Sequence, residues 1–467
     1  MNDNVKTVHE KYQEMLPRWQ LMDDVCDGST AVEAADYLPK ICFSDDEHEN
    51  MLENRNYKKR AVFFDYTKDT LNEMTGVAFQ KDPVFDADGL DILSSDADGS
   101  GRSLFQVSQL ALTGLLRHAR CGLFVDYPIT DGNVSKLDIE RKGLRPTIVY
   151  YKAKNIINWR IKKVGSTYKT ELVVLKESDT IVDPLNEFQL KTIDVYRVLR
   201  LDKDGYYTIE VYQPDTNGQL ASGGPMHPTN KSGSKWTEIP FIPLGSFAND
   251  WSIDAIPLES MAIMNIKHYI NSADYEDSVH TTGQIQPVIT GASDGFEGED
   301  KDKKPVKLGS KNALDLPTGA KFEYVQARME MVVKEAMDDK VKYMQALGAR
   351  AITEHNLVKT ATQSNNEALA KYSVLSLCVA NINEAMITAL KWCYDYSGMG
   401  AGATFIINQE FAGAKLTVEE MKIYQNMVVE GVLSKRSFFE VIKSGKMPET
   451  TYEQEQQQVK VESAENI

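Results

Sequence analysis

Apolar residues recur at helical spacing in three long segments of the second half of the chain. They predict helices over residues 258–280, 328–347 and 366–393. At 1.5 Å per residue, each helix would span roughly 30 Å or more. The expected apolar stripes contain Met329, Val333, Ala336, Tyr343 and Leu347 in the second helix, where Lys340 interrupts the spacing, and Leu369, Tyr372, Leu375, Val379, Ile382, Met386, Leu390 and Cys393 in the third.

The segments between these helices differ in character. Residues 283–325 form a charged insertion with strand-like runs at 286–290 and 322–325, whereas residues 348–365 read as a polar loop. The pattern therefore predicts a small β insertion after the first helix and an irregular connection after the second.

The first 130 residues read as helices joined by loops. One helix is expected over residues 57–76, with Val62, Tyr66 and Met74 near one face. A turn at residues 96–101 precedes a capping box of Ser103 with Gln106, which opens an apolar helix. A buried strand over residues 122–128 follows, and Pro128 ends it.

Residues 146–243 change to a strand pattern. Runs of β-branched and aromatic residues predict strands at 147–151, 168–175, 192–201 and 206–212, the last two joined by a hairpin turn at 202–205. The fold class expected for the whole chain is α+β.

The C-terminal part is expected to form two short helices. Their predicted starts are capping boxes, and Gly431 and Gly445 are the expected stops. The tail from Thr450 is rich in Glu and Gln and is expected to fray. The two boxes pair Thr417 with Glu420 and Ser437 with Glu440.

Composition narrows the function classes. The chain has 467 residues, with 52 Lys and Arg against 68 Asp and Glu, a net charge of −16, and 42% hydrophobic residues. The apolar content excludes a disordered chain. The acidic balance argues against a protein that coats nucleic acid, because such binding needs cations at the phosphates.

Five widely spaced cysteines contain no C-x-x-C pair, so reduced packing residues are expected instead of a disulfide framework or a zinc site. The polar N-terminus is not a signal peptide, and the apolar run at residues 110–116 is too short to cross a membrane. A protein of the reducing cytoplasm, with no membrane partner, is expected.

Motifs of catalysis and of metal or cofactor binding find little support. Asp96-x-Asp98-x-Ser100 resembles the start of a calcium loop, but its twelfth position is Val107. Gly291-Ala-Ser293-Asp-Gly295 matches a nucleophile elbow, yet a charged loop follows it instead of a helix. His268 and His280 lack ligand spacing and are expected on a polar face, and neither a phosphate-binding loop nor a dinucleotide fingerprint occurs. No catalytic, cofactor or metal residue is assigned.

Basic residues around the second helix and the following loop remain as candidates for contact with DNA. Their alternative role is a solvated face that pairs with Glu335, Asp338 and Asp339. The candidates are Lys340, Lys342, Arg350, His355 and Lys359.

The order of elements, more than any motif, resembles the portal protein of tailed double-stranded DNA bacteriophages, in particular a group catalogued as a domain of unknown function. The resemblance covers residues 37–439. The stretches that carry it are Tyr37–Lys40, Asn56–Ala61, Asp98–Leu104, Cys121–Pro128, Ile239–Pro243 and Ala346–Arg350.

The resemblance implies an elongated subunit of a ring, usually of twelve copies, at one capsid vertex. It implies a mixed α/β wing, long stem helices, a β-containing clip that binds the head-to-tail adaptor, a tunnel loop and a short helical crown. The implied boundaries are 1–250 wing, 251–282 stem helix, 283–325 clip, 326–347 second stem helix, 348–365 tunnel loop, 366–412 wing helix and return strand, and 413–467 crown and tail.

The implied function is a channel for genome packaging and ejection, without enzymatic activity or cofactors. The implied partners are the terminase motor, the adaptor, the capsid or scaffolding protein and the DNA that passes through the channel, in a virion assembled in the host cytoplasm. The alternatives are a serine hydrolase that uses Ser293, and a scaffold or adaptor without a channel. Expected adaptor-binding residues are Asp294, Phe296, Glu297, Lys301, Lys303 and Lys304.

Overall fold

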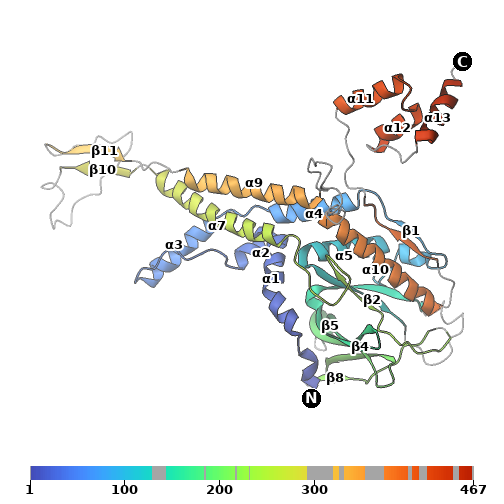
Figure 1. The fold of residues 1–467 in the computed structure, drawn as a ribbon. Helices are drawn as coiled ribbons and strands as arrows, with labels where there is room; N and C mark the ends of the chain where they lie inside the picture. The colour runs from blue at the N-terminus through green and yellow to red at the C-terminus, as the bar shows by residue number, and fades with distance from the viewer. Residues whose placement is uncertain are drawn as a thin grey trace.

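The computed structural model shows a mixed helix and sheet body from which one pair of helices projects (Figure 1). The α+β class expected from the sequence is confirmed. The structure describes residues 2–128, 143–183, 186–215, 218–230, 232–284, 286–291, 319–325, 331–352, 373–397, 402–409, 418–444 and 452–464.

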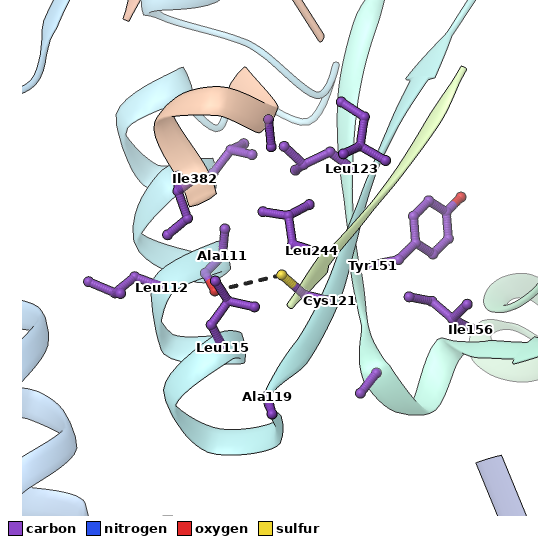
Figure 2. Close-up of a cluster of buried hydrophobic side chains, with 14 of the residues drawn as sticks. Ala111, Leu112, Leu115, Ala119, Cys121, Leu123, Tyr151, Ile156, Leu244 and Ile382 are labelled. Atoms are coloured by element: carbon purple, nitrogen blue, oxygen red, sulfur yellow. Dashed lines mark hydrogen bonds between the residues drawn. The ribbon is translucent and has the colours of Figure 1, made fainter. Parts of the chain in front are cut away.

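A three-stranded antiparallel sheet forms the centre of the body. Strand β2 (Arg120–Asp126) lies between β3 (Thr147–Lys152) and β9 (Phe241–Gly245). Helices α5 (Leu104–His118) and α10 (Val374–Ser397) pack against this sheet, and their apolar side chains interleave with those of the strands (Figure 2). Because β2 is covered, six of its seven residues are buried, which accounts for the apolar run from Cys121 to Val125 within it.

Glycine at position 122 permits this packing. A Cβ built on Gly122 would lie 2.2 Å from Cζ of Phe241, a contact that no real side chain tolerates. The sequence analysis missed strand β9 because Pro240 precedes the strand and Pro243 lies within it. It lies at the edge of its sheet, where proline is tolerated.

The second sheet is an antiparallel meander in the order β4-β5-β6-β7-β8. The predicted turn at residues 202–205 is confirmed: the Gly205 N–H donates to the Asp202 carbonyl, and Gly205 has φ +83°. Strands β5 and β6 are longer than predicted, and β4 was missed. The strands are β4 (Ile156–Val164), β5 (Thr167–Asp183), β6 (Asn186–Leu201), β7 (Tyr207–Pro214) and β8 (Leu220–Ser222).

Several predicted local features of the body are confirmed. Asp96 Oδ1 accepts hydrogen bonds from the N–H groups of Gly99 and Gly101, which closes the turn. Ser103 and Gln106 form the reciprocal capping box at the start of α5. All five cysteines are free, four of them buried and Cys42 half-buried.

The helix predicted over residues 57–76 is wrong. The structure has α3 (Glu47–Arg60) and α4 (Tyr66–Ala78), and residues 61–65 between them are not helical. Val62 is 41% exposed, so it does not belong to the predicted buried face. The helix is interrupted here because side chains of a distant helix satisfy backbone groups of this segment, as described below.

The remaining N-terminal elements pack against the body. Helix α1 contributes Trp19, whose indole N–H donates to the His118 carbonyl at 2.9 Å. A two-stranded pair joins β1 and β12. These elements are α1 (Glu10–Asp27), α2 (Ser29–Ala34), β1 (Val84–Asp86), β12 (Thr404–Ile406) and three short 3-10 helices at Asn2–Lys6, Asp91–Ser94 and Ala153–Asn155.

Helix α10 confirms the described part of the third predicted helix, since its stripe from Leu375 to Cys393 is buried. Residues 366–372 lie outside the described residues. By length and mean hydropathy, 1.3 over 18 residues, α10 is also apolar enough to cross a membrane, which the sequence prediction overlooked. Half of that window is buried inside the protein, and Glu384 and Lys391 lie on the exposed side.

The C-terminal part has three described helices, α11 (Val418–Val429), α12 (Lys435–Ser444) and α13 (Tyr452–Ala464). The chain turns after α11 at Gly431, as predicted, with φ +70°. The Ser437 capping box is wrong, because α12 starts earlier and the Ser437 N–H donates to Ser434 Oγ.

The tail predicted to fray is instead helix α13. Glu455 of this helix is buried and accepts hydrogen bonds from Ser434 N at 2.7 Å and Ser437 Oγ at 2.8 Å. These bonds attach the Glu- and Gln-rich segment to α12. Thr417 and Gly445 lie outside the described residues.

Candidate functional site

Helices α7 (Glu259–Thr282) and α9 (Val332–Ile352) lie side by side and project from the body (Figure 1). Strands β10 (Gln286–Thr290) and β11 (Lys321–Val325) pair antiparallel at the far end, as Figure 1 shows. The predicted sequence of helix, β insertion and helix is therefore confirmed in its described parts.

The second helix starts and ends later than predicted, so residues 348–352 are helical instead of part of a polar loop. Its predicted seam is also wrong at one position. Tyr343 is 48% exposed, whereas its neighbour Met344 is 1% exposed and faces the interior. Lys340 lies on that same half-buried side, four residues before Met344.

The half of α7 nearest the body is attached by buried polar side chains. Asn265 Oδ1 accepts from Thr67 N at 3.1 Å and from Thr67 Oγ1 at 3.0 Å, and its Nδ2 donates to the Phe64 carbonyl at 2.9 Å. Two helical turns further along α7, Ser272 Oγ accepts a hydrogen bond from Val62 N and donates one to the Val62 carbonyl. These bonds replace the helical hydrogen bonds that residues 61–65 would otherwise make.

Charged contacts reinforce this attachment. Tyr57 OH donates to Asp274 Oδ1 at 2.6 Å, and Arg60 pairs with Asp277. At the other end of α7, Arg18 of α1 pairs with Glu259. Together the contacts attach α7 from its first residue to Asp277.

His268 lies at the junction of α7 with Phe64 and Tyr66. The imidazole is 2% exposed and meets both rings edge-to-face, and its Nδ1 has no hydrogen-bond partner among the described residues. The prediction of a polar-face histidine is therefore wrong for His268. Burial lowers the pKa of His268, and the charge of Lys340 adds a smaller effect in the same direction. The charge of Asp338 acts in the opposite direction but does not outweigh them.

The half of the pair furthest from the body has no comparable core. No residue of α7 after Ala273 is buried, and Met344 is the first buried residue of α9. Apolar side chains here remain open to solvent: Met331 is 48% exposed, Val332 66% and Tyr324 64%. Exposed apolar surface of this extent is typical of an interaction site.

The candidate DNA-contact residues are placed differently from one another. Lys342 lies on the exposed side of α9 beside Asp339, with their charged atoms 3.3 Å apart. Lys340 turns back, and its Nζ donates to the Ala336 carbonyl at 3.2 Å. Arg350 belongs to the last turn of α9. His355 and Lys359 lie outside the described residues.

The expected adaptor-binding residues and Ser293 also lie outside the described residues, so β10 and β11 are the described part of the insertion. Within the described ranges, no three His, Cys, Asp or Glu side chains gather as a metal site would need. Asp96 and Asp98 bind N–H groups of their own turn instead.

Sequence reasoning missed Asn265 and Ser272. A signal was present, because polar residues seven positions apart lie on one face of a helix that is otherwise apolar there. The partner of that face could not be read from the sequence, since Val62 and Phe64 are about two hundred residues away.

A family model described as "Domain of unknown function (DUF4055)" matches residues 257–397. The matched stretch runs from the start of α7 to the end of α10, so it contains the projecting pair and its hairpin. No curated protein matches the chain.

Among solved structures, the chain is similar to one in "Neck of native GTA particle computed with C12 symmetry", with a TM-score of 0.41, 14% identity, and coverage of 82% of this chain and 91% of that chain. A chain of "Virion of native gene transfer agent (GTA) particle" has the same TM-score of 0.41 and 14% identity, with coverage of 90% and 98%. TM-scores below 0.5 do not establish a shared fold, so the function has to rest on the chain's own residues.

Proposed function

We propose that this chain is the portal subunit of a tailed phage or phage-like particle. In this role it is a non-enzymatic component of a ring, about twelve copies at one capsid vertex, through which DNA enters and leaves. The portal resemblance of the sequence and the arrangement of α7, the β10–β11 hairpin and α9 support the proposal.

The observation that carries it is the incomplete burial of the projecting pair. Helix α7 is 24 residues long, about 36 Å at 1.5 Å per residue, but its buried residues end at Ala273. Contact between copies would cover Met331 and Val332, which the subunit leaves exposed. A closed ring supplies such contacts to every copy.

The elements take the following roles in the proposal. Residues 1–250 with 366–412 are the wing, residues 251–282 and 326–347 the stem, and residues 283–325 the clip. The tunnel loop is expected within 348–365, of which residues 348–352 extend α9. The crown is 413–467, with α11 to α13 as its described helices.

The proposed channel holds DNA weakly. A subunit with a net charge of −16 repels phosphate, so a few basic side chains can guide DNA without arresting its movement. Lys342 is the candidate whose side chain is described and exposed, Arg350 belongs to the last turn of α9, and His355 and Lys359 fall within the expected tunnel loop. Lys340 is a weaker candidate because it faces α7.

The partners follow from these roles. A terminase motor supplies packaging energy, because the chain has no phosphate-binding loop. The head-to-tail adaptor binds the clip, and the major capsid or scaffolding protein surrounds the wing. The ring assembles in the host cytoplasm and ends in the virion.

Negative-stain microscopy of the purified protein tests the proposal. Rings with a central channel and about twelve copies are expected. A protein that remains monomeric at high concentration would contradict it, and compact particles without a channel would favour a scaffold or adaptor.

The channel is tested by Arg350→Glu combined with Lys359→Glu. Genome packaging should fall while rings still assemble, because two guiding cations per subunit become anions. The matched control is Lys203→Glu, an exposed lysine in the β6–β7 turn, which should package normally. Normal packaging by the double variant would remove both residues from the channel.

A further inference from the structure

Strand β5 joins two exposed hairpin ends of opposite charge. At the β4–β5 end, every residue from 160 to 169 is exposed. Residues 160–170 contain four basic side chains and no acidic one, in a chain that is acidic overall. Ile161 is 46% exposed and Tyr168 68% exposed between these cations. The four are Arg160, Lys162, Lys163 and Lys169.

Two of these four cations already have a carboxylate partner within the subunit. Glu171 accepts from Arg160 at 2.7 Å and lies 3.8 Å from Lys162. Lys163 and Lys169 have no ion pair among the described residues, and Lys163 lies over the ring of Tyr168 at 5.8 Å. The β4–β5 end is therefore a cationic surface with an aromatic ring at its centre.

At the opposite end, β5 and β6 continue as a two-stranded ribbon. Pairing with β4 stops at Leu175 and pairing with β7 stops at Tyr196, so in the described part of the chain no further strand pairs with the ribbon beyond these residues. Its residues 178–182 and 186–192 are all exposed. A lone two-stranded ribbon is marginally stable in water and offers open edges.

One face of the ribbon is apolar. The register shifts at the tip of the ribbon, where Asp183 pairs with Asn186. Val182 and Leu190 pair just before this shift and share a face, and Phe188 lies among the extra residues of β6 that the shift creates. The side chains of Val182, Leu190 and Phe188 are 54%, 65% and 89% exposed, respectively. The pair of Thr180 and Thr192 extends this face without charge.

The ribbon is acidic overall. Residues 178–193 contain three carboxylic acids and a single lysine, of which Asp179 and Glu187 are exposed acids. The ribbon therefore complements the β4–β5 end in two properties. Its acidic residues match the basic residues of that end, and its apolar side chains match the exposed aromatic ring of Tyr168. The two ends cannot meet within one subunit, since β5 separates them by about 50 Å at 3.3 Å per residue.

We propose that the β5–β6 ribbon of one copy docks against the β4–β5 end of the next copy. Opposite ends of the same sheet then make a head-to-tail contact, and such contacts close into rings when the rotation permits. Only the closure into a ring rests on the proposed portal function; the contact itself needs only a second copy of this chain.

A cysteine pair tests the contact directly. Tyr168→Cys with Phe188→Cys places one thiol at each end, too far apart to bond within a subunit. Oxidation of the assembled double variant should give a ladder beyond the dimer on a non-reducing gel, and each single variant should not. Intact rings without a ladder, or a dimer alone, would overturn the contact.

Charge reversal supplies an independent measurement. Lys163→Glu with Lys169→Glu should lose assembly by mass photometry, as should Asp179→Lys with Glu187→Lys, because each places like charges across the contact. Combining all four changes should restore it. Circular dichroism of each variant should match the wild type, since all four side chains are exposed.

The outcomes separate this contact from the portal proposal. Rings that form in all charge variants overturn the contact and leave the portal proposal standing. Unchanged rings with weaker DNA retention in Lys163→Glu/Lys169→Glu would assign the basic end to DNA and also overturn it. Head-to-tail chains without closed rings would support the contact and contradict the portal.

Discussion

Helices α7 and α10 are both 24 residues long, yet their surroundings differ. Helix α10 has buried residues from Leu375 to Tyr394, because the central sheet and α5 cover one side along its whole length. The buried residues of α7 end at Ala273, beyond which α9 and the polar contacts of α3 with Asp274 and Asp277 lie beside the helix without burying its residues. The subunit therefore covers one side of α10, whereas the far half of α7 remains partly exposed.

The chemistry of attachment differs as well. The buried stripe of α10 is mostly apolar, whereas α7 is attached through Asn265, Ser272 and ion pairs at its edges. Polar attachment needs matched partners and fixes direction, while apolar packing supplies more stability per residue. The projecting pair is thus oriented precisely but stabilised modestly.

The largest expected effect comes from a substitution in the packed core of the body, the well-covered region of this comparison. Leu112→Ala empties space in the core on the side of α5 that faces away from the strands (Figure 2), where Leu112 is fully buried, and should lower the unfolding free energy by about 2–5 kcal/mol. The matched change Val332→Ala, at a 66% exposed position, should alter it by less than about 0.5 kcal/mol.

Urea unfolding of both variants in monomeric form measures the difference. Val332→Ala should instead reduce assembly, since the exposed apolar surface is assigned to neighbours. Equal loss of stability in both variants would show that the projecting pair is as well packed as the body.

A second, smaller effect is expected at the attachment of α7. Asn265→Ala leaves the Phe64 carbonyl and Thr67 N–H without buried partners, which should cost about 1–3 kcal/mol. Hydrogen exchange should rise in residues 61–67 and in α7, with little change in β2. Uniform exchange across the body would mean that the projecting pair and the body unfold as one unit.

Acid should weaken the body through Asp23 and His118, whose Oδ1 and Nε2 atoms lie 2.7 Å apart. Burial, only partly opposed by Asp23, lowers the pKa of His118 from 6.5, so the unfolded chain takes up this proton first. Burial opposes ionisation of Asp23, but His118, Lys154 and Arg117 outweigh it, and the pKa of Asp23 is lowered.

The pKa values of His118 and Asp23 are both lower in the folded protein than in the unfolded chain. Stability should fall as pH drops below about 6.5, and again below the ordinary aspartate range near 3.8, because the unfolded state binds more protons in each window. Urea midpoints at pH 7.5, 5.5, 4 and about 2.5 measure both falls. His118→Gln should flatten the first step, and an unchanged profile would exclude His118 as its source.

The smallest expected effect is at a helix cap. Ser103 Oγ accepts from Gln106 N at 3.2 Å, and Ser103→Ala should cost about 1 kcal/mol. Ser103→Asp keeps an acceptor and should retain most of the stability. Thermal unfolding of the two variants compares them, and equal loss in both would show that the cap does not depend on the acceptor.

Much of the fold was predictable from local pattern. The stripe of α10, the Ser103 capping box and the turn at Asp202 all follow from residues within a few positions of one another, and the two strands of the insertion were recognisable from their composition. Strand β4 and helix α13 were missed. The first gains its hydrogen bonds from β5, and the second depends on the buried contact of Glu455 with Ser434.

The site shows the same division. The order of helix, β insertion and helix came from the sequence, but the inward-facing residue of α9 did not. Tyr343 and Met344 are adjacent and both apolar, and only the position of α7 decides which one is buried. The anchoring role of Asn265 was equally hidden, because its partners belong to a segment whose own pattern indicates helix.

By itself, the sequence determined the helical and strand periodicities, the local caps and turns, and the acidic balance, because each depends on short-range sterics or on composition. The tertiary structure alone decided that residues 61–65 are not helical, that His268 is buried and that no residue of α7 beyond Ala273 is buried. Those features depend on which distant groups meet, and hydrogen bonds and burial between distant segments can override local preference.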